Sequence, residues 1–467
     1  MTPKFAVVND QDRRPAPPDR HRGQRRFAER FVHVHGGRFL FVHGIGWHEF
    51  TGARWEPCQD GAEVRAMCEV VSAALDDLRA LDDQSRKELV KDISAMDSNA
   101  GVTGALALAS AMEPCTLAGH LLDRDAHLIN TASGTVDLRL GELRDADPDD
   151  RLSKMTAAKF DPAARSEVFD EFLSTIQPDP DMRAFLARSL GSALLGRVVE
   201  HVLLIWFGTG ANGKGTLRDA VRHALGDYGI EVPAEVLLQS RHGQQALAPE
   251  RMRLRGARAA FCSEIAAGAR LDEATMKKLT GGDPVNAKLL YRNPVEFDPS
   301  HTLFMLTNHL PVVHGDDPAV WRRILAVPFD TVVPVEKRDG HLPERLRECP
   351  DAVLAWLWAG WLDYAENGLN PPDAVTEATQ KYRLDSDVLA RFLADDGAVV
   401  QGHGSVGSAE LYSAFKAWGR AEGEEIEQSN KAFTEAMELR GYRRKRGSGG
   451  WRWSGLMIAS KDGQDHD

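Results

Sequence analysis

The residues best suited to chemistry lie in a glycine-rich segment between positions 208 and 216. Its pattern, Gly208-x4-Gly213-Lys214, follows a nearly continuous apolar run and precedes a helical pattern. In a loop between a strand and a helix start, backbone N–H groups can converge on phosphate oxygens, with the positive end of the helix dipole behind them. The segment therefore predicts a site for ATP, with Lys214 reaching the β- and γ-phosphates.

One position of this segment departs from the usual pattern for a magnesium ligand. Gly215 stands where a Ser or Thr usually holds Mg²⁺, so the next hydroxyl, Thr216, is the candidate ligand. The competing interpretation, a glycine turn with a solvated lysine, does not explain the strand and helix on either side. The candidate nucleotide-binding residues are Gly208, Gly210, Asn212, Gly213, Lys214, Gly215 and Thr216.

Three further segments contain residues that could complete a hydrolytic site. An apolar strand pattern ends in Glu264, whose carboxylate can polarise an attacking water and join Thr216 in holding Mg²⁺. A second strand pattern ends in Asn308, whose amide can bind the water or the γ-phosphate. Arg322 and Arg323 follow, and a guanidinium there can stabilise charge in the transition state. Alone, each has an ordinary explanation as an exposed acid, a turn residue or solvated arginines; their shared order and spacing favour catalysis.

The elements that must position these residues divide the chain into four parts. Residues 1–26 are rich in Pro and Arg and predict a flexible tail. Residues 27–178 predict an α+β and helical accessory domain, with short strands over 27–57. Strands and helices that alternate to about residue 330 predict an α/β layered domain over 179–370. Residues 386–458 predict a small C-terminal domain with a helix, a second helix and a basic hairpin.

Bulk composition sets few limits on function. The net charge of −12 decides nothing, because a basic lumen can coexist with an acidic exterior. The five cysteines are scattered and form no Cys-x-x-Cys pair, which argues against a disulfide framework or a zinc site. Apolar runs are too short to span a bilayer, and the N-terminus lacks a signal-peptide pattern. We therefore expect a cytoplasmic protein.

Together, these motifs resemble the superfamily 3 helicases, specifically the phage and poxvirus primase–helicase family. The segments that carry the resemblance are Gly-x-Gly-x-Asn-Gly-Lys at 208–214, Ser263-Glu264, Lys278-Leu-Thr-Gly-Gly-Asp283, Thr307-Asn308-x-Leu-Pro311 and Trp321-Arg322-Arg323-Ile324. A predicted hairpin over 127–138 and the segment 46–55 resemble the N-terminal accessory region of that family.

The resemblance implies an AAA+-like core that hydrolyses ATP at the subunit interfaces of a hexameric ring. It also implies 3′-to-5′ movement on single-stranded or forked DNA during replication of a phage, prophage or other mobile element in a bacterial host. By position, Lys214 becomes the phosphate lysine, Glu264 the catalytic acid, Asn308 the sensor and Arg323 the arginine finger. Ser263 stands where the family often has a second acid, so Glu264 must be the only catalytic carboxylate of this motif.

Primer synthesis is not expected from this chain. Larger members of the family carry a separate primer-synthesising domain, and no cluster of catalytic aspartates or zinc cysteines precedes the recognisable region. A separate primase or a replication initiator is therefore an expected partner.

Two basic segments predict contacts with DNA. Lys288, Tyr291 and Arg292 occupy the tip of a predicted hairpin, at the place where related helicases project a hairpin into the ring channel. The C-terminal domain resembles a winged helix, with a basic wing. The candidate wing contacts are Arg443, Arg444, Lys445 and Arg446. For both segments, a solvated surface hairpin is the competing interpretation.

Two other functions remain open. A non-unwinding, ATP-regulated DNA-binding or loading protein of a mobile element would fit the unusual Gly215 and the missing primase part. The Gly-Lys-Gly-Thr ending of the loop is also similar to nucleoside monophosphate kinases. Those chains are usually shorter, begin with the loop near the N-terminus, and lack the downstream Thr-Asn strand and paired arginines.

Overall fold

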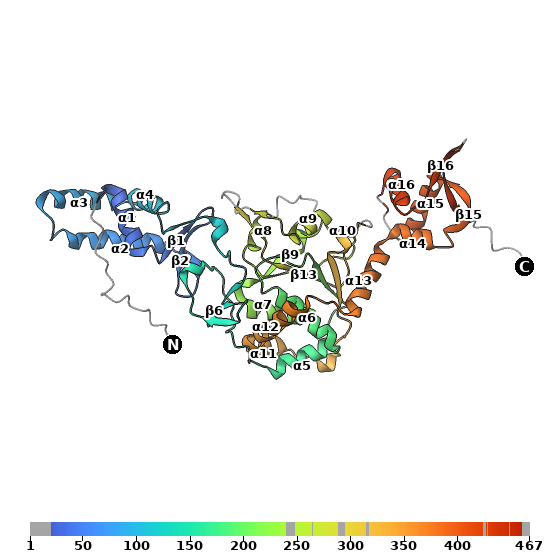
Figure 1. Ribbon diagram of the computed structural model, residues 1–467, viewed down its shortest axis with the longest axis horizontal. Coiled ribbons are helices and arrows are strands. Elements are labelled where there is room, and N and C mark those ends of the chain that lie inside the picture. The colour runs from blue at the N-terminus through green and yellow to red at the C-terminus, as the bar shows by residue number, and fades with distance from the viewer. Residues whose placement is uncertain are drawn as a thin grey trace, which may run out of the picture.

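The molecule is elongated, with a helical bundle at one end, a parallel sheet covered by helices in the centre and a small helix-and-hairpin unit at the other end (Figure 1). The computed structural model describes residues 20–239, 248–263, 265–287, 295–313, 317–423, 426, 428–447 and 449–459. Within these ranges, no helix combines the length and the apolar character needed to cross a membrane.

The N-terminal part is a helical bundle beside a small sheet. The helices are α1 (Gly23–His35), α2 (Ala62–Asp77), α3 (Asp83–Met96) and α4 (Asn99–Ala109). The strands run in the order β3 (Trp55–Pro57), β2 (Gly46–Phe50), β1 (Phe39–Val42) and β4 (Thr116–Leu117).

Helix α1 corrects two expectations from the sequence. Residues 23–26 were assigned to the tail and 27–35 to the short strands, yet both segments are helical. Phe27 and Phe31 lie one helical turn apart and are fully buried, so they form an apolar helix face. The helix extends back toward Gly23 because the buried Arg26 lies 2.9 Å from Asp92 of α3. The rest of the predicted tail lies outside the described residues, apart from positions 20–22.

A second sheet, which is antiparallel throughout, leads into the centre of the molecule. It contains β5 (Leu128–Thr131), β6 (Gly134–Asp137) and β7 (Glu142–Arg144), in that order. Thr131 pairs with Gly134, which confirms the hairpin predicted over 127–138. Helices α5 (Glu167–Ile176) and α6 (Pro180–Ser192) follow, and α6 begins where Asp179 accepts a hydrogen bond from the Asp181 backbone N–H.

The central sheet is entirely parallel. Its strand order is β14 (Ile324–Pro328), β8 (Leu203–Phe207), β13 (Thr302–Thr307), β10 (Ala259–Ser263) and β9 (Gly229–Pro233). Leu204 and Trp206 pack into one hydrophobic cluster, while Leu203 and Ile205 pack into another on the opposite face. Both faces are covered, which explains why β8 is almost uniformly apolar. The chain therefore has the predicted α/β fold, and its central sheet is parallel.

Two layers of helices cover this sheet. One layer contains α5, α6, α7 (Lys214–Leu225), α11 (Leu342–Arg347) and α12 (Pro350–Asn367); the other contains α8 (Ala248–Arg253), α9 (Glu273–Leu279) and α10 (Pro318–Trp321) (Figure 1). Helices α6 and α12 cross at Gly360, where a Cβ would lie only 1.9 Å from the Ala187 carbonyl oxygen. Strands β11 (Val285–Ala287) and β12 (Val295–Phe297) pair antiparallel beside the second layer.

The C-terminal unit follows helix α13 (Asp373–Ser386), which packs on β14. It contains α14 (Val388–Ala394), β15 (Val399–Gly407), α15 (Ser408–Ala421), α16 (Asn430–Leu439), β16 (Arg444–Gly447) and β17 (Gly450–Ile458). The antiparallel strand order is β15-β17-β16. The apolar stripes of α15 and α16 form its core with Trp453, as expected, and Ser429 caps α16. Helix α14 and strand β15 were not predicted.

Candidate nucleotide-binding site

The glycine-rich loop leaves the sheet at the carboxyl end of β8, between β8 and α7. Strand register aligns Phe207 at the end of β8 with Thr307 of β13 and Pro328 of β14, so three strand ends meet there. Helix α7 begins at Lys214, and the free N–H groups of its first turn point back toward the loop. Ligands of open parallel sheets bind outside the carboxyl ends of the strands, so this position suits a phosphate group.

The Lys214 side chain folds back into the loop. Its Nζ donates hydrogen bonds to the Gly208 carbonyl and to Asn212 Oδ1, each at 2.9 Å, while Asn212 Nδ2 donates to the Phe329 carbonyl at 2.9 Å. The lysine is only 6% exposed, and burial lowers the pKa of its ammonium to about 8. The loop therefore holds a desolvated positive charge against neutral oxygens, which a phosphate oxygen can replace.

At Gly213 the glycine-rich loop packs against helix α5. Its φ of +77° is unfavourable for any residue with a side chain, and an added Cβ would lie 2.3 Å from Ile176 Cγ2. The close approach explains why this position of the loop requires glycine. It also places α5 directly against the loop.

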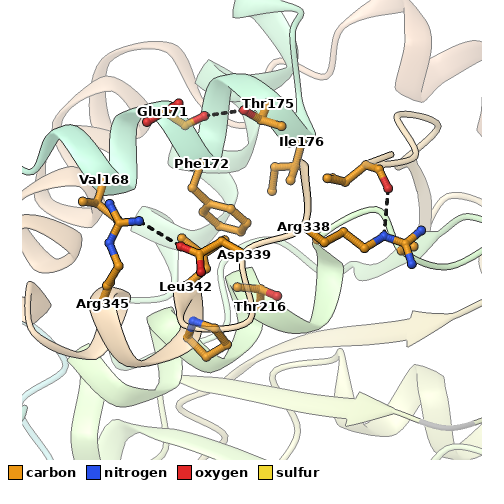
Figure 2. A pocket seen from close by; sticks show the side chains of 14 residues that line it. Val168, Glu171, Phe172, Thr175, Ile176, Thr216, Arg338, Asp339, Leu342 and Arg345 are labelled. Carbon is orange, nitrogen blue, oxygen red and sulfur yellow. Dashed lines mark hydrogen bonds and ion pairs between the residues drawn. The ribbon is translucent and has the colours of Figure 1, made fainter. Parts of the chain in front are cut away.

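A cavity of about 440 Å³ opens beside the loop (Figure 2). Its walls come from α5, from the loop with the first turn of α7, and from residues 333–345. The lining residues are Val168, Glu171, Phe172, Thr175, Ile176, Ala211, Gly213, Thr216, Val333, Arg338, Asp339, Leu342, Pro343 and Arg345. A partly apolar chamber beside a cationic loop has the size and character to receive a nucleoside.

Most of this cavity was missed by sequence reasoning. Phe172 and Leu342 have the spacing of ordinary core residues, so nothing local distinguishes them from the rest of the helix interior. The rim is polar: Arg345 Nη1 lies 2.9 Å from Asp339 Oδ2, and Arg338 Nε donates to the Val333 carbonyl at 3.0 Å. Only the contact between segments distant in sequence reveals the chamber.

The structure brings some of the predicted catalytic residues to this edge of the sheet. Thr216 lines the cavity, two residues after Lys214. Asn308 is exposed and directly follows β13, whose last residue is in register with the end of β8. Glu264 lies outside the described residues, immediately after β10. The described part of the site therefore contains the Lys214 ammonium and the Thr216 hydroxyl, and the Asn308 amide follows at the same edge of the sheet.

Arg322 and Arg323 lie at the opposite edge of the sheet. The Arg323 carbonyl accepts a hydrogen bond from the Leu203 N–H at 2.6 Å, at the amino end of β8. Five residues of β8 separate this point from the loop, or about 16 Å at 3.3 Å per residue. This separation exceeds the reach of an arginine side chain. Neither arginine can therefore contact the candidate nucleotide site of the same chain.

The predicted DNA-binding residues divide into two groups. Lys288, Tyr291 and Arg292 lie outside the described residues, although β11 and β12 form an antiparallel base on either side of them. The second group lies on the hairpin of β16 and β17, where Arg444, Lys445 and Arg446 belong to β16 and Arg443 precedes it. All of this second group is exposed except Arg444, which is half-buried.

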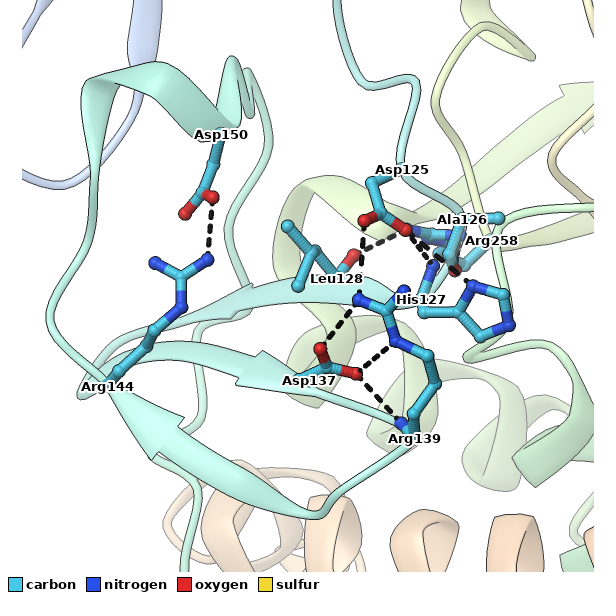
Figure 3. A network of polar contacts seen from close by, with 9 residues as sticks. All are labelled: Asp125, Ala126, His127, Leu128, Asp137, Arg139, Arg144, Asp150 and Arg258. Atoms are coloured by element: carbon cyan, nitrogen blue, oxygen red, sulfur yellow. Dashed lines mark hydrogen bonds and ion pairs between the residues drawn. The ribbon is translucent and has the colours of Figure 1, made fainter.

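The buried Arg258 links the small β5-β6-β7 sheet to the central sheet through hydrogen bonds (Figure 3). Arg258, just before β10, donates to the carbonyls of Ala126 at 3.1 Å and Leu128 at 2.7 Å. Its guanidinium also lies 5.4 Å from the ring centroid of Tyr228, whose hydroxyl accepts a hydrogen bond from the Asn130 N–H. The accessory region is therefore attached to the strand that leads to Glu264.

Within the part of the chain that the structure describes, no three His, Cys, Asp or Glu side chains are grouped as a metal cluster would require. All five cysteines are free. Burial raises the pKa of the Cys262 thiol to about 12, so this sulfur is an inert part of the core.

The fold and the site define an α/β protein with a cationic glycine loop at the carboxyl edge of a parallel sheet. A family model described as "D5 N terminal like" matches residues 28–178, and "Family of unknown function (DUF5906)" matches residues 206–323. A protein of Acanthamoeba polyphaga mimivirus with the curated name "Putative helicase" is 29% identical over 388 residues, covering 75% of this chain and 40% of that protein.

Other relatives agree with these matches. A "Putative helicase" of Frog virus 3 is 24% identical and covers 64% of this chain and 39% of its own length. A "Putative primase" of African swine fever virus is 24% identical, and the match covers 59% of this chain and 31% of that protein. These matches support the resemblance of the chain to the phage and viral primase–helicase family. It spans about two fifths of the length of the first two relatives.

Among solved structures, the chain is similar to the apo C-terminal region of NrS-1. The sequence identity is 11%, the TM-score is 0.39, and the match covers 65% of this chain and 78% of that one.

Proposed function

We propose that the chain is an ATP-dependent DNA helicase of a phage, prophage or other mobile element, acting in replication as a hexameric ring on single-stranded or forked DNA. The observation that carries the proposal is the Lys214 ammonium, desolvated in a glycine loop beside a cavity of about 440 Å³. In this proposal, residues 179–370 are an AAA+-like P-loop core, 27–178 an accessory domain and 386–458 a winged-helix domain. The viral relatives named as helicases support the assignment to DNA.

The proposed chemistry gives each candidate residue one role. Loop N–H groups and Lys214 bind the phosphates, and the neighbouring cavity takes the base and sugar. Thr216 supplies a hard oxygen in the cavity wall, and a carboxylate from Glu264 would complete a ligand set of the kind that Mg²⁺ prefers. When bound, Mg²⁺ neutralises charge on the phosphate oxygens. Glu264 orients the attacking water, and Asn308 holds the water or the γ-phosphate by hydrogen bonds.

In this proposal, the positive charge that stabilises the transition state comes from an arginine of a neighbouring subunit. Arg323 lies at the amino edge of the sheet, far from its own loop, so it can act only on the site of another copy. A head-to-tail interface that closes into a ring presents this edge of one subunit to the carboxyl edge of the next. Arg322, its exposed neighbour, is the alternative donor.

An ATPase assay with and without single-stranded DNA tests the proposal. We expect ATP hydrolysis that single-stranded DNA accelerates and a coupled unwinding activity on forked DNA. DNA binding without unwinding would instead favour the ATP-regulated loading protein, and phosphoryl transfer to a nucleoside monophosphate would favour the kinase. A particle-mass measurement with an ATP analogue and DNA present tests the hexamer.

A further inference from the structure

Trp451 is an exposed aromatic side chain near the turn of the β16–β17 hairpin. It is 47% exposed and pairs across the strands with Arg446, whereas the fully buried Trp453 pairs with Arg444. Because side chains alternate along a strand, these four residues share one face of the hairpin. The face that forms the core at Trp453 therefore continues outward to an indole in solvent.

Neighbouring groups hold this indole in place. The Arg444 guanidinium lies 4.7 Å from the centroid of the Trp451 ring and 5.9 Å from that of Trp453. Arg444 Nε also lies 2.8 Å from Glu438 Oε1 of α16, so the cation is fixed against the body of the unit. Because this cation–π contact covers one face of the Trp451 ring, the exposed part of the side chain is the rest of the indole. The result is a preorganised stacking surface.

The charge around Trp451 favours a polyanion. Lys445 lies directly opposite Arg452, and like charges in this position destabilise a pair of strands. No Asp or Glu occurs between positions 439 and 461, so the hairpin supplies no neutralising acid of its own. Phosphates would relieve this repulsion. Cations on the edge strand β16 also discourage strand pairing, but that role does not require an exposed tryptophan.

We infer that Trp451 is a base-stacking residue for single-stranded nucleic acid, with Arg446 on the same face of the hairpin contacting the adjacent phosphate. The inference rests on the proposed DNA-binding function and deepens it by naming the strand state recognised. An unpaired base offers a free π face to the indole, whereas the bases of a duplex are already stacked on one another.

Fluorescence anisotropy of the full chain with labelled oligothymidylate and with a duplex of equal length tests the inference. Trp451→Ala should weaken single-strand binding by roughly 5- to 150-fold, the loss expected for one base–aromatic stack, and should leave duplex binding unchanged. Trp451→Phe should retain most of the affinity. Leu439→Ala is the matched control, because Leu439 is an 88% exposed apolar residue of the same unit, and it should bind like the wild type.

Salt dependence separates stacking from charge. Trp451→Ala should leave the slope of log K against log salt unchanged, while Arg446→Gln should reduce its magnitude by about 0.7 for single strands. Unchanged melting temperatures would show that the variants fold. Wild-type affinity in Trp451→Ala, or an equal loss on single strands and duplexes, would overturn the inference alone. A wild-type chain that binds no DNA would overturn the proposed function as well.

Discussion

Replacing Arg323 with alanine tests whether two subunits share each nucleotide site. Arg323 lies about 16 Å from its own loop along β8, so its loss should not affect the binding of nucleotide to the same subunit. Its side chain also contributes little to the fold. Nη1 makes one long hydrogen bond of 3.4 Å to the His201 carbonyl, and Nε meets no acceptor in the described part of the chain. We expect a stability loss of no more than about 1 kcal/mol.

The expected effect on catalysis is much larger. An arginine that stabilises the transferring phosphoryl group is worth about 10³–10⁵ in rate, or roughly 4–7 kcal/mol of transition-state stabilisation. The Arg323→Ala variant should therefore bind nucleotide with an affinity within a few-fold of the wild type while losing at least about 10³-fold in kcat. Steady-state ATPase assays and fluorescent-nucleotide titration measure the two quantities. Arg383→Ala, at an exposed position of α13, is the control and should hydrolyse ATP normally.

Mixing experiments then show whether the arginine acts on a neighbour. Each Arg323→Ala subunit should inactivate the nucleotide site of its wild-type neighbour in a mixed ring. An equal mixture of Arg323→Ala and Lys214→Ala should recover activity at about a quarter of the interfaces, where an intact loop meets an intact arginine. Turnover by Arg323→Ala within a few-fold of the wild type, or no recovery of activity in the equal mixture of the two variants, would refute the shared site.

Two predictions concern Lys214, and a third concerns Arg258. Lys214→Ala should abolish hydrolysis because the γ-phosphate loses its main cation, and near-normal turnover in the ATPase assay would refute the site assignment. Because burial lowers the Lys214 pKa to about 8 and a bound phosphate favours the ammonium, nucleotide affinity should fall as pH rises above 8. Calorimetry at pH 8.5 in two buffers should accordingly detect proton uptake, and identical heats in both buffers would contradict it. Arg258→Met should destabilise the protein by about 1–3 kcal/mol, because the Leu128 carbonyl loses the Arg258 donor while the Ala126 carbonyl keeps only the Gly196 N–H, and should speed hydrogen exchange in β5; unchanged exchange there would contradict the proposed role of Arg258 in attaching this sheet.

Local sequence determined the elements that carry the phosphate loop. The apolar run before Gly208 predicted a strand covered on both faces, and β8 has its alternate residues in two separate hydrophobic clusters. The hairpin over 127–138 and the α/β class of the central domain were also predicted, because turn residues and residue patterning act over a few neighbouring positions. Helix α1 was missed because its aromatic residues have high strand propensity, and burial of Phe27 and Phe31 on one face overrides it.

Tertiary structure decided everything that depends on segments distant in the chain. Only the packing of α5 and residues 333–345 against the loop creates the cavity, and only the strand order places Arg323 at the edge opposite Lys214. The lowered pKa of Lys214 likewise comes from burial in the loop and cannot be deduced from neighbouring residues. Propensities and motifs depend on residues adjacent in sequence, whereas cavities, desolvation and shared sites depend on which surfaces the folded chain brings together.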